Sequence, residues 1–191
     1  MVALAPSAPQ APADPELLSR IAAGDLECLG ILYDRYVEDV RRFLLRIGVG
    51  PAELDDLVQQ SFLEVVRAAK NFDGRPSARP WLLGVTASMA RRSRRSFART
   101  ASRLKIWTKA VEGKHPVTPA ESLEGEEAKQ RALSALDALS HDKREAFVLV
   151  VLEGASGEEA AAALGVPVNT IWVRVHHARK ALKAKLLGDP S

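Results

Sequence analysis

Residues 71–109 read NFDGRPSARPWLLGVTASMARRSRRSFARTASRLKIWTK and contain the strongest pattern in the chain. A loop containing Gly74 comes first, and Pro80 stands where the first turn of a helix tolerates proline. Apolar residues at helical spacing follow, and then a run of arginine and lysine with no acidic residue between Asp73 and Glu112. A helix with a buried face and a basic continuation is typical of a polyanion-binding protein. A solvated basic face is the alternative, and the charge run alone does not decide between them.

The distribution of charge along the chain is more informative than the net charge. The 191 residues carry a formal charge of +3, but acidic residues cluster at 53–64 and 121–127 and basic residues at 75–109 and 174–185. The chain is 47% hydrophobic and only 5% aromatic, so we expect aliphatic cores. Its one cysteine, Cys28, excludes an internal disulfide and a multi-cysteine metal site, and we expect a buried small hydrophobe there.

No strand-like alternation is found along the chain, so the sequence predicts an all-α fold. We expect a disordered tail over residues 1–13, a helical domain over 14–106, a flexible linker over 107–121 and a second helical domain over 122–188. The tail lacks the features of a signal peptide, and no apolar run approaches the roughly 20 residues of a membrane helix. We therefore expect a cytoplasmic protein without membrane insertion.

Three helices are expected before the loop, at residues 15–23, 26–47 and 53–69. Asp25 is placed to cap the second of them. The third helix has an apolar stripe that we expect to face inward: Leu54, Leu57, Val58, Ser61, Phe62, Val65 and Ala69. Its opposite side mixes polar residues with one leucine: Asp55, Asp56, Gln59, Gln60, Leu63 and Arg67. A leucine on a polar face is consistent with a partner surface, although single exposed leucines are common.

The second domain has the pattern of a helix-turn-helix. Helices are expected at 122–139, 141–152, 157–164 and from Pro167 to about Leu187. Ser156 and Glu159 form a capping-box pair before the third of these helices, and Gly165 lies in the turn that follows it. We expect its small core to contain Ala161, Leu164, Val166, Ile171, Val175, Ala178 and Leu182.

Catalytic patterns are not found in the chain. There is no phosphate-cradling glycine loop and no nucleophile elbow. His176 and His177 are adjacent, so on a helix they point about 100° apart and share a metal poorly. Asp55 and Asp56 diverge for the same reason. We expect neither an enzyme nor a metal or other cofactor.

Several motifs in order resemble a group 4 sigma factor, the extracytoplasmic function (ECF) type of the sigma-70 family, over about residues 24–187. The matching segments are 24–26, 32–36, 55–63, 72–74, 81–82, 143–147, 152–154, 164–168, 170–171, Arg174 and 178–182. The resemblance implies a sigma factor that directs RNA polymerase to promoters. It assigns the outward face of the 53–69 helix, Asp55, Asp56, Gln59, Gln60, Leu63 and Arg67, to docking on the clamp helices of the largest polymerase subunit.

The resemblance also implies promoter DNA and an anti-sigma factor as partners. The loop and helix after residue 72 would capture the minus-ten element as it melts, and the helix-turn-helix would read the minus-thirty-five element. Together with the basic patterns, it assigns DNA contacts to Asp73, Arg75, Arg79, Trp81, Ser88, Arg91, Arg94, Arg95, Arg99, Asn169, Thr170, Trp172, Val173, Arg174, His176, His177, Arg179 and Lys180.

Helical spacing makes these assignments more specific. With Trp81, Leu82, Val85 and Met89 as the inward stripe, Arg91, Arg94, Arg95 and Arg99 are expected to share the outer face, and Arg92 to be partly packed. In the last helix, Ile171, Val175 and Ala178 are expected to turn inward, which leaves Asn169, Trp172, Val173, His176 and His177 facing the DNA groove.

Three positions depart from the family in ways that bear on DNA reading. Ser88 stands where the family usually has asparagine, and Trp172 and Val173 replace a Lys-Ser pair. An indole and an isopropyl group can contact thymine methyls or sugars but offer little hydrogen bonding. We therefore expect weak direct readout by this helix, unless Trp172 packs on the preceding helix and does not reach the groove.

Two other functions remain compatible with the sequence. One is a stand-alone helix-turn-helix repressor or activator, which rarely needs the acidic helix and the loop with its basic helix ahead of the reader. The other is a degenerate sigma-like protein that binds polymerase or an anti-sigma factor and no longer reads DNA, and the Trp172-Val173 change favours it.

Overall fold

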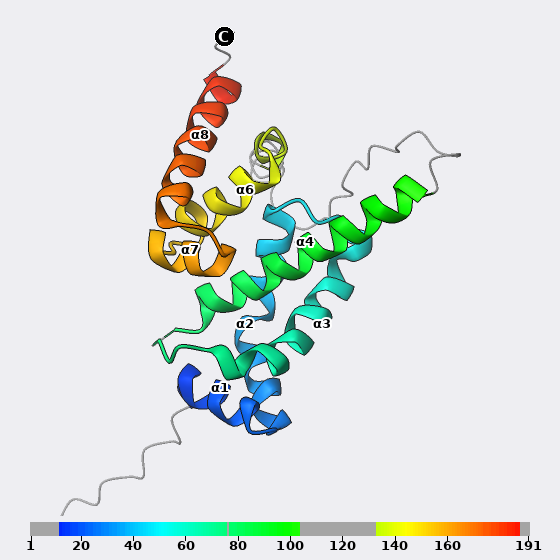
Figure 1. The fold of residues 1–191 in the computed structure, drawn as a ribbon, viewed down its shortest axis with the longest axis vertical. Coiled ribbons are helices and arrows are strands. Elements are labelled where there is room, and N and C mark those ends of the chain that lie inside the picture. Colours follow the sequence, from blue (N-terminus) through cyan, green and yellow to red (C-terminus); the bar gives the residue numbers. More distant parts are fainter. Residues whose placement is uncertain (1–11, 76, 104–132, 188–191) are drawn as a thin grey trace, which may run out of the picture.

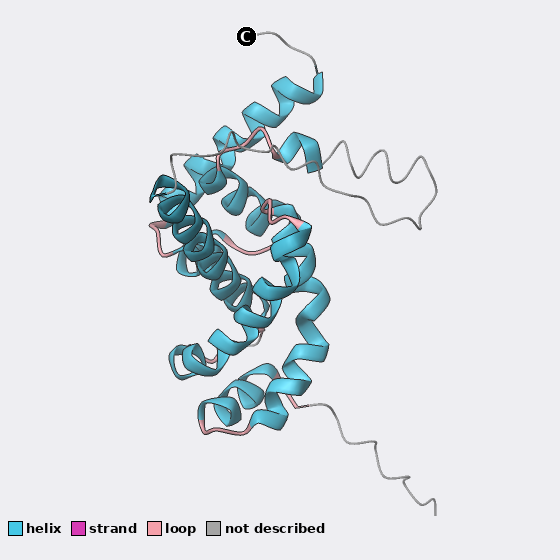
Figure 2. Cartoon of the chain, turned by 90° about the vertical axis from the view of Figure 1, so that its right-hand side faces the viewer, coloured by secondary structure: helices cyan, strands magenta, loops and turns pink. Residues whose placement is uncertain are grey.

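The computed structural model describes residues 12–75, 77–103 and 133–187. These residues form helices joined by short loops, without a strand among them, as Figure 2 shows. The all-α prediction is therefore confirmed. The predicted linker, 107–121, lies outside the described residues, as does the predicted tail apart from Pro12 and Ala13.

The first half of the fold contains α1 (Asp14–Ala22), α2 (Leu26–Arg46), α3 (Pro51–Ala68) and a 3-10 turn at Ala69–Asn71. Each predicted helix agrees with the observed one to within two residues. Asp25 caps α2, since its carboxylate accepts from the backbone N–H groups of Glu27 and Cys28. The predicted inward stripe of α3 is buried, and so is Cys28.

The second half begins, within the described residues, with a short helical segment at 133–136. It continues with α6 (His141–Phe147), a π-helical turn at Val148–Leu152, α7 (Gly157–Leu164) and α8 (Val168–Leu187). The capping box is confirmed: Glu159 N donates to Ser156 Oγ at 3.1 Å, and Ser156 N donates to Glu159 Oε2 at 2.8 Å. Gly165 ends α7 with a φ of +66°, a conformation that favours glycine.

The predicted core of the helix-turn-helix is largely confirmed. The buried members are Ala161, Leu164, Ile171, Val175, Ala178 and Leu182, and Val166 is half-buried. The sequence pattern did not predict the π-helical turn, because a change from a four- to a five-residue hydrogen-bond spacing leaves little trace in apolar periodicity.

The two halves pack against each other through α4 (Arg79–Arg103). In Figure 1 this helix crosses the middle of the molecule, and it contacts α2 and α3 on one side and α7 on the other. A Cβ atom on Gly84 of α4 would lie 2.6 Å from Cβ of Ala163 in α7, so only glycine allows this approach. Buried apolar residues of both halves form one hydrophobic cluster.

Contact on two sides changes which face of α4 is buried. Leu82, Leu83, Thr86, Ala87 and Ala90 are buried, whereas Trp81, Val85 and Met89 are only half-buried. The predicted inward stripe was therefore incomplete. Leu82 is buried and Trp81 and Met89 pack against the core, but the stripe left out Leu83, Thr86, Ala87 and Ala90. It assumed one buried face, and the packing of α7 against α4 creates a second one.

Candidate nucleic-acid and polymerase interfaces

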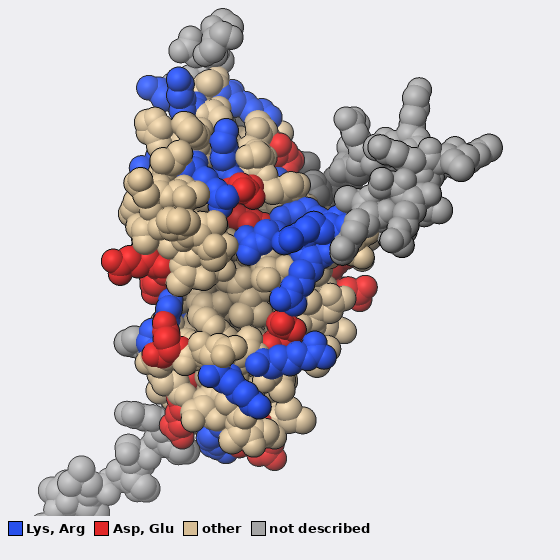
Figure 3. Space-filling model, in the orientation of Figure 1, with Lys and Arg blue, Asp and Glu red and all other residues tan. Residues whose placement is uncertain are grey.

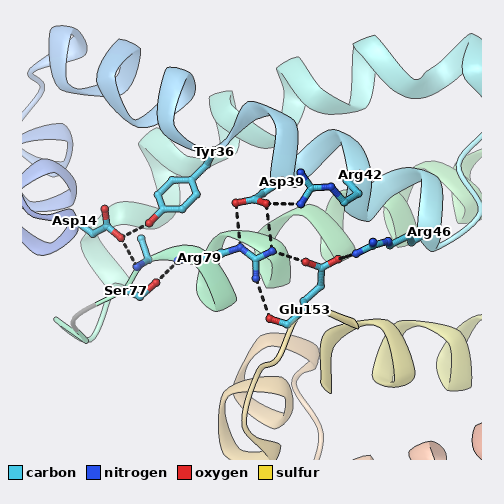
Figure 4. A network of polar contacts seen from close by, with 9 residues as sticks. Asp14, Tyr36, Asp39, Arg42, Arg46, Ser77, Arg79 and Glu153 are labelled. Carbon is cyan, nitrogen blue, oxygen red and sulfur yellow. Dashed lines mark hydrogen bonds and ion pairs between the residues drawn. The ribbon is translucent and has the colours of Figure 1, made fainter. Parts of the chain in front are cut away.

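The loop before α4 is attached to the first two helices by one buried carboxylate. Asp14 of α1, 5% exposed, accepts from Ala78 N at 2.7 Å, from Tyr36 Oη at 2.5 Å and from Arg35 Nη1 at 2.5 Å. Figure 4 shows the first two of these contacts. Burial, and then the hydrogen bond to Asp14, raise the pKa of Tyr36 to about 12. Asp14 therefore fixes the point where the loop turns into α4.

Sequence reasoning missed Asp14. An aspartate in the first turn, followed by Pro15, looks like an ordinary helix-start residue, and its long-range partners leave no local signal.

The loop itself presents polar and aromatic groups. Asp73 and Arg75 are paired, and this pairing lowers the pKa of Asp73 to about 2. Phe72 and Trp81 pack edge to face, with ring centroids 5.3 Å apart, and both rings are half-buried. Gly74 has a φ of +76°, which lets the loop turn tightly. The predicted loop residues thus lie together at the start of α4.

Arg79 connects this loop to the second half of the molecule. Its guanidinium donates to Asp39 of α2 (Nε to Oδ2, 3.0 Å) and to the backbone oxygen of Glu153 (Nη1, 2.9 Å), and it also pairs with the Glu153 carboxylate. Figure 4 shows these contacts side by side. The Arg79 guanidinium lowers the pKa of Asp39 below its ordinary value. Arg79 was assigned to DNA, and here its donors bind the carboxylates of Asp39 and Glu153 and the backbone oxygen of Glu153.

Two of the predicted outer-face arginines face inward instead. Arg91 Nη1 and Arg94 Nη2 donate to the two carboxylate oxygens of Glu145 in α6, at 2.9 and 2.7 Å. They continue the row of buried Ala87, four and seven residues earlier in the helix, so they lie where α4 meets the second half. The prediction that Arg91 and Arg94 lie on the outer face of the helix was therefore wrong.

The other arginines of α4 differ from this pair in exposure. Arg95 is exposed, as predicted. Arg92, expected to be partly packed, is also exposed, although it pairs with Glu64 of α3 at 3.2 Å. The side chain of Arg99 lies outside the described residues. Ser88 is half-buried.

The outward face of α3 has the predicted composition. Its six residues, Asp55, Asp56, Gln59, Gln60, Leu63 and Arg67, are all exposed, and Leu63 is 65% exposed. Asp55 pairs with Arg41 of α2 at 2.7 Å, and Arg67 pairs with Glu64 at 3.4 Å. The structure thus exposes the leucine among polar groups as expected, an arrangement that is also common on surfaces without a partner.

The outward face of α8 is also as predicted. Asn169, Trp172, Val173, His176 and His177 are exposed, and so are Arg179 and Lys180, whereas Thr170 is half-buried. Figure 3 shows basic side chains along α8 and over part of α4, with acidic ones between them. Arg174 is half-buried and pairs with Asp142 of α6 at 2.5 Å.

Trp172 packs on the preceding helix although it is 48% exposed. A Cβ atom on Gly157, at the start of α7, would lie 2.6 Å from Cζ2 of the indole. The ring thus lies over the glycine and does not extend freely into solvent, which supports the packed alternative. The rings of His176 and His177 are 5.8 Å apart, with their planes tilted by 59°.

None of the described helices is long and apolar enough to cross a membrane. In the same part of the chain, no group of three or more His, Cys, Asp or Glu side chains is placed to hold a metal ion.

Comparison with known proteins agrees with this geometry. The family model described as "Sigma-70 region 2" matches residues 32–100, which span α2 to α4, and "Sigma-70, region 4" matches residues 129–182. The ECF RNA polymerase sigma factor SigC of Mycobacterium tuberculosis is 36% identical over 151 residues, 77% of this chain and 77% of that protein. The ECF RNA polymerase sigma-E factor of Escherichia coli K12 is 28% identical over 180 residues, 91% and 94% of the two chains.

Solved structures show the same fold. CnrH, in complex with the cytosolic domain of CnrY, is 27% identical with a TM-score of 0.65, covering 94% of this chain and 100% of that one. The sigma factor RpoE of Bartonella quintana, in complex with the anti-sigma factor NepR, is 24% identical with a TM-score of 0.68, covering 84% and 98%. The chain therefore belongs to the sigma-70 family and is an RNA polymerase sigma factor of the ECF type.

Proposed function

We propose that this sigma factor divides polymerase docking and promoter recognition among three surfaces. The exposed face of α3 docks on the clamp helices of core RNA polymerase. The loop at 72–78 and α4 capture the minus-ten element as it melts, and the outward face of α8 contacts the minus-thirty-five element. Domains at 14–106 and 122–188, with 107–121 as a flexible linker, would carry these roles.

The observation that carries the proposal is the attachment of the loop to α1 and to the start of α4. Asp14 holds the Ala78 N–H, and Phe72 packs on Trp81, so the loop has a defined shape at the start of a basic helix. Bases that have left the duplex are bound in shaped pockets with nearby cations, whereas duplex DNA is read by a helix in the groove. The loop is therefore suited to unpaired bases, and α8 is suited to duplex DNA.

The partners follow from the same surfaces. We propose that they are core polymerase, promoter DNA and an anti-sigma factor. The anti-sigma factor is included because the similar protein RpoE was solved with the anti-sigma factor NepR, and CnrH with the cytosolic domain of CnrY. A protein with these partners works in the cytoplasm, and it supplies recognition while the catalytic chemistry belongs to polymerase.

Run-off transcription tests the proposal. The chain is added to bacterial core polymerase on a pool of genomic fragments, and the start sites are sequenced. We expect transcripts from a restricted set of promoters that share a minus-ten sequence, with a more weakly shared minus-thirty-five sequence because α8 reads bases poorly. Transcripts that start at shared minus-ten sequences without a shared minus-thirty-five sequence would mean that α8 only positions the domain. Polymerase binding with no promoter-specific transcript would favour a degenerate sigma-like protein.

A further inference from the structure

We propose that Asn169 and Val173 of α8 select A·T base pairs in duplex DNA. The asparagine amide binds the edge of an adenine, and the valine covers the methyl group of a thymine. This names the bases that α8 reads, and it rests on the proposed contact of the outward face of α8 with the minus-thirty-five element.

The two side chains lie in one row at the start of the helix, since α8 begins at Val168. They are four positions apart, so they point in nearly the same direction from the helix axis. Both are exposed, and Val173 is 49% exposed. In a helix-turn-helix, the N-terminal residues of the second helix contact base edges in the major groove. Asn169 and Val173 therefore stand where bases are read.

Two larger side chains beside this row are held against the protein. The indole of Trp172 lies over Gly157 of α7, where a Cβ atom would be 2.6 Å from Cζ2 of the ring. The guanidinium of Arg174 pairs with Asp142 of α6 at 2.5 Å. The exposed amide and isopropyl groups of the row are therefore better placed to enter the groove than the indole or this guanidinium.

The chemistry of the row matches the major-groove edges of A·T pairs. The asparagine amide donates to N7 of adenine and accepts from its N6 amino group, which makes a two-bond contact. Thymine is the base that carries a methyl group in the major groove, and an apolar side chain buries that methyl. A valine offers neither a donor for guanine nor an acceptor for cytosine. The pair thus favours A·T over G·C.

The spacing along α8 suits two base pairs that are one or two steps apart. Four residues of helix rise about 6 Å, whereas stacked base pairs are about 3.4 Å apart. Further along the helix, Arg179 and Lys180 are exposed and suited to phosphates. We therefore expect most of the affinity to be independent of sequence and the A·T preference to be modest.

The experiment is a binding selection with the full-length chain on two duplex libraries that share a randomised segment. One library contains thymine, and the other contains deoxyuridine in its place, which pairs in the same way but lacks the methyl group. Bound duplexes are sequenced. In the first library we expect an enriched adenine, by about tenfold, and an enriched thymine at a fixed spacing from it, by roughly fourfold, the effect of burying one methyl group. In the second library the adenine should stay enriched and the uracil should not.

Two variants assign each base to its residue. Val173→Ala should lose the thymine enrichment and keep the adenine, and Asn169→Ala should do the reverse. The average affinity of either variant for duplex DNA should change little, because phosphate contacts supply most of it. The control is Val168→Ala, which removes a valine that is 37% exposed on the same helix but points in another direction. It should keep both enrichments. All three positions are exposed, and circular dichroism checks that the variants fold.

Several outcomes overturn the A·T preference. Equal enrichment of thymine and uracil would remove the role of the methyl group, and thymine enrichment that survives Val173→Ala would remove the role of the valine. Enrichment of G·C pairs, or of no sequence, would contradict both contacts. Run-off transcription by the natural chain separates this idea from the proposed function: promoter-specific transcripts without A·T enrichment overturn only the base preference. Absence of both duplex binding and promoter-specific transcripts overturns the proposed function as well.

Discussion

The carboxylate of Asp14 accepts a hydrogen bond at 2.7 Å from the backbone N–H of Ala78, which is 64 positions further along the chain. This bond ties the first helix to the start of α4. It also determines where the loop that carries Asp73 and Arg75 leaves the protein surface. A residue at the edge of the expected disordered tail therefore positions a loop that we propose contacts DNA.

Replacing Asp14 with alanine should destabilise the fold. The change leaves the Ala78 N–H and the Tyr36 hydroxyl without their acceptor, and Arg35 without its ion-pair partner. We expect the free energy of unfolding to fall by about 2–4 kcal/mol, because buried groups lose their partners. Urea denaturation measures the change. Asp34→Ala, at an exposed position of α2, is the control, and equal effects of the two changes would contradict the anchoring role.

Tyr36 should make stability depend on alkaline pH. Its pKa is raised from 10.0 to about 12, so the folded state holds this proton more tightly than the unfolded state. The stabilisation is fully present below pH 10 and is lost as the pH rises toward 12. We expect the difference in unfolding free energy between the natural chain and Tyr36→Phe to shrink over this range. A difference that stays constant would mean that Tyr36 does not titrate as described.

The outward face of α3 should matter for polymerase and not for folding. Leu63→Ala, or Asp56→Ala with Gln60→Ala, should weaken core polymerase binding by about 1–3 kcal/mol, because interface groups lose their contacts. Leu63 is 65% exposed, so its removal should leave the unfolding free energy nearly unchanged. A pull-down titration measures the affinity, with Glu38→Ala on α2 as the control. Unaltered affinity in both variants would remove the docking assignment.

Arg95 should contribute to phosphate binding, since it is exposed. Arg95→Ala should reduce the slope of log affinity against log salt by roughly 0.7–0.9, the value for one phosphate contact. Stability should not change. Arg20→Ala, an exposed position on α1, should leave the slope as it is. If Arg95→Ala leaves the salt slope as unchanged as Arg20→Ala does, Arg95 is only a solvated charge.

Trp172 and Val173 should limit reading of duplex DNA. Replacing them with Lys and Ser should strengthen binding to a family-like minus-thirty-five duplex by roughly 1 kcal/mol, because one charged contact is gained. Val173→Ser alone keeps the indole on Gly157 and should change affinity little. Anisotropy titration of the full chain measures both variants. Strong, sequence-selective binding by the natural chain that is lost in the Lys-Ser variant would show that the indole itself reads DNA.

Local patterns in the sequence are enough to locate the helices and to predict most of what they expose. Apolar spacing located α2, α3 and α8, and Asp25 and the Ser156–Glu159 pair marked helix starts. The polar face that contains Leu63 follows from the same spacing. All of these are local properties, since helical periodicity and capping depend on residues within a few positions of one another.

The role of α4, in contrast, depends on tertiary packing. Its sequence shows one apolar stripe, whereas contact with α3 on one side and α7 on the other also buries Leu83, Thr86, Ala87 and Ala90, which lie outside that stripe. That packing brings Arg91 and Arg94 to Glu145, Arg79 to Glu153 and Asp14 to Ala78. The partners are 51 to 74 positions apart, so their pairing depends on the relative placement of whole helices. Local residue pattern does not encode that placement, because a buried ion pair forms only where the surrounding packing brings both charges together.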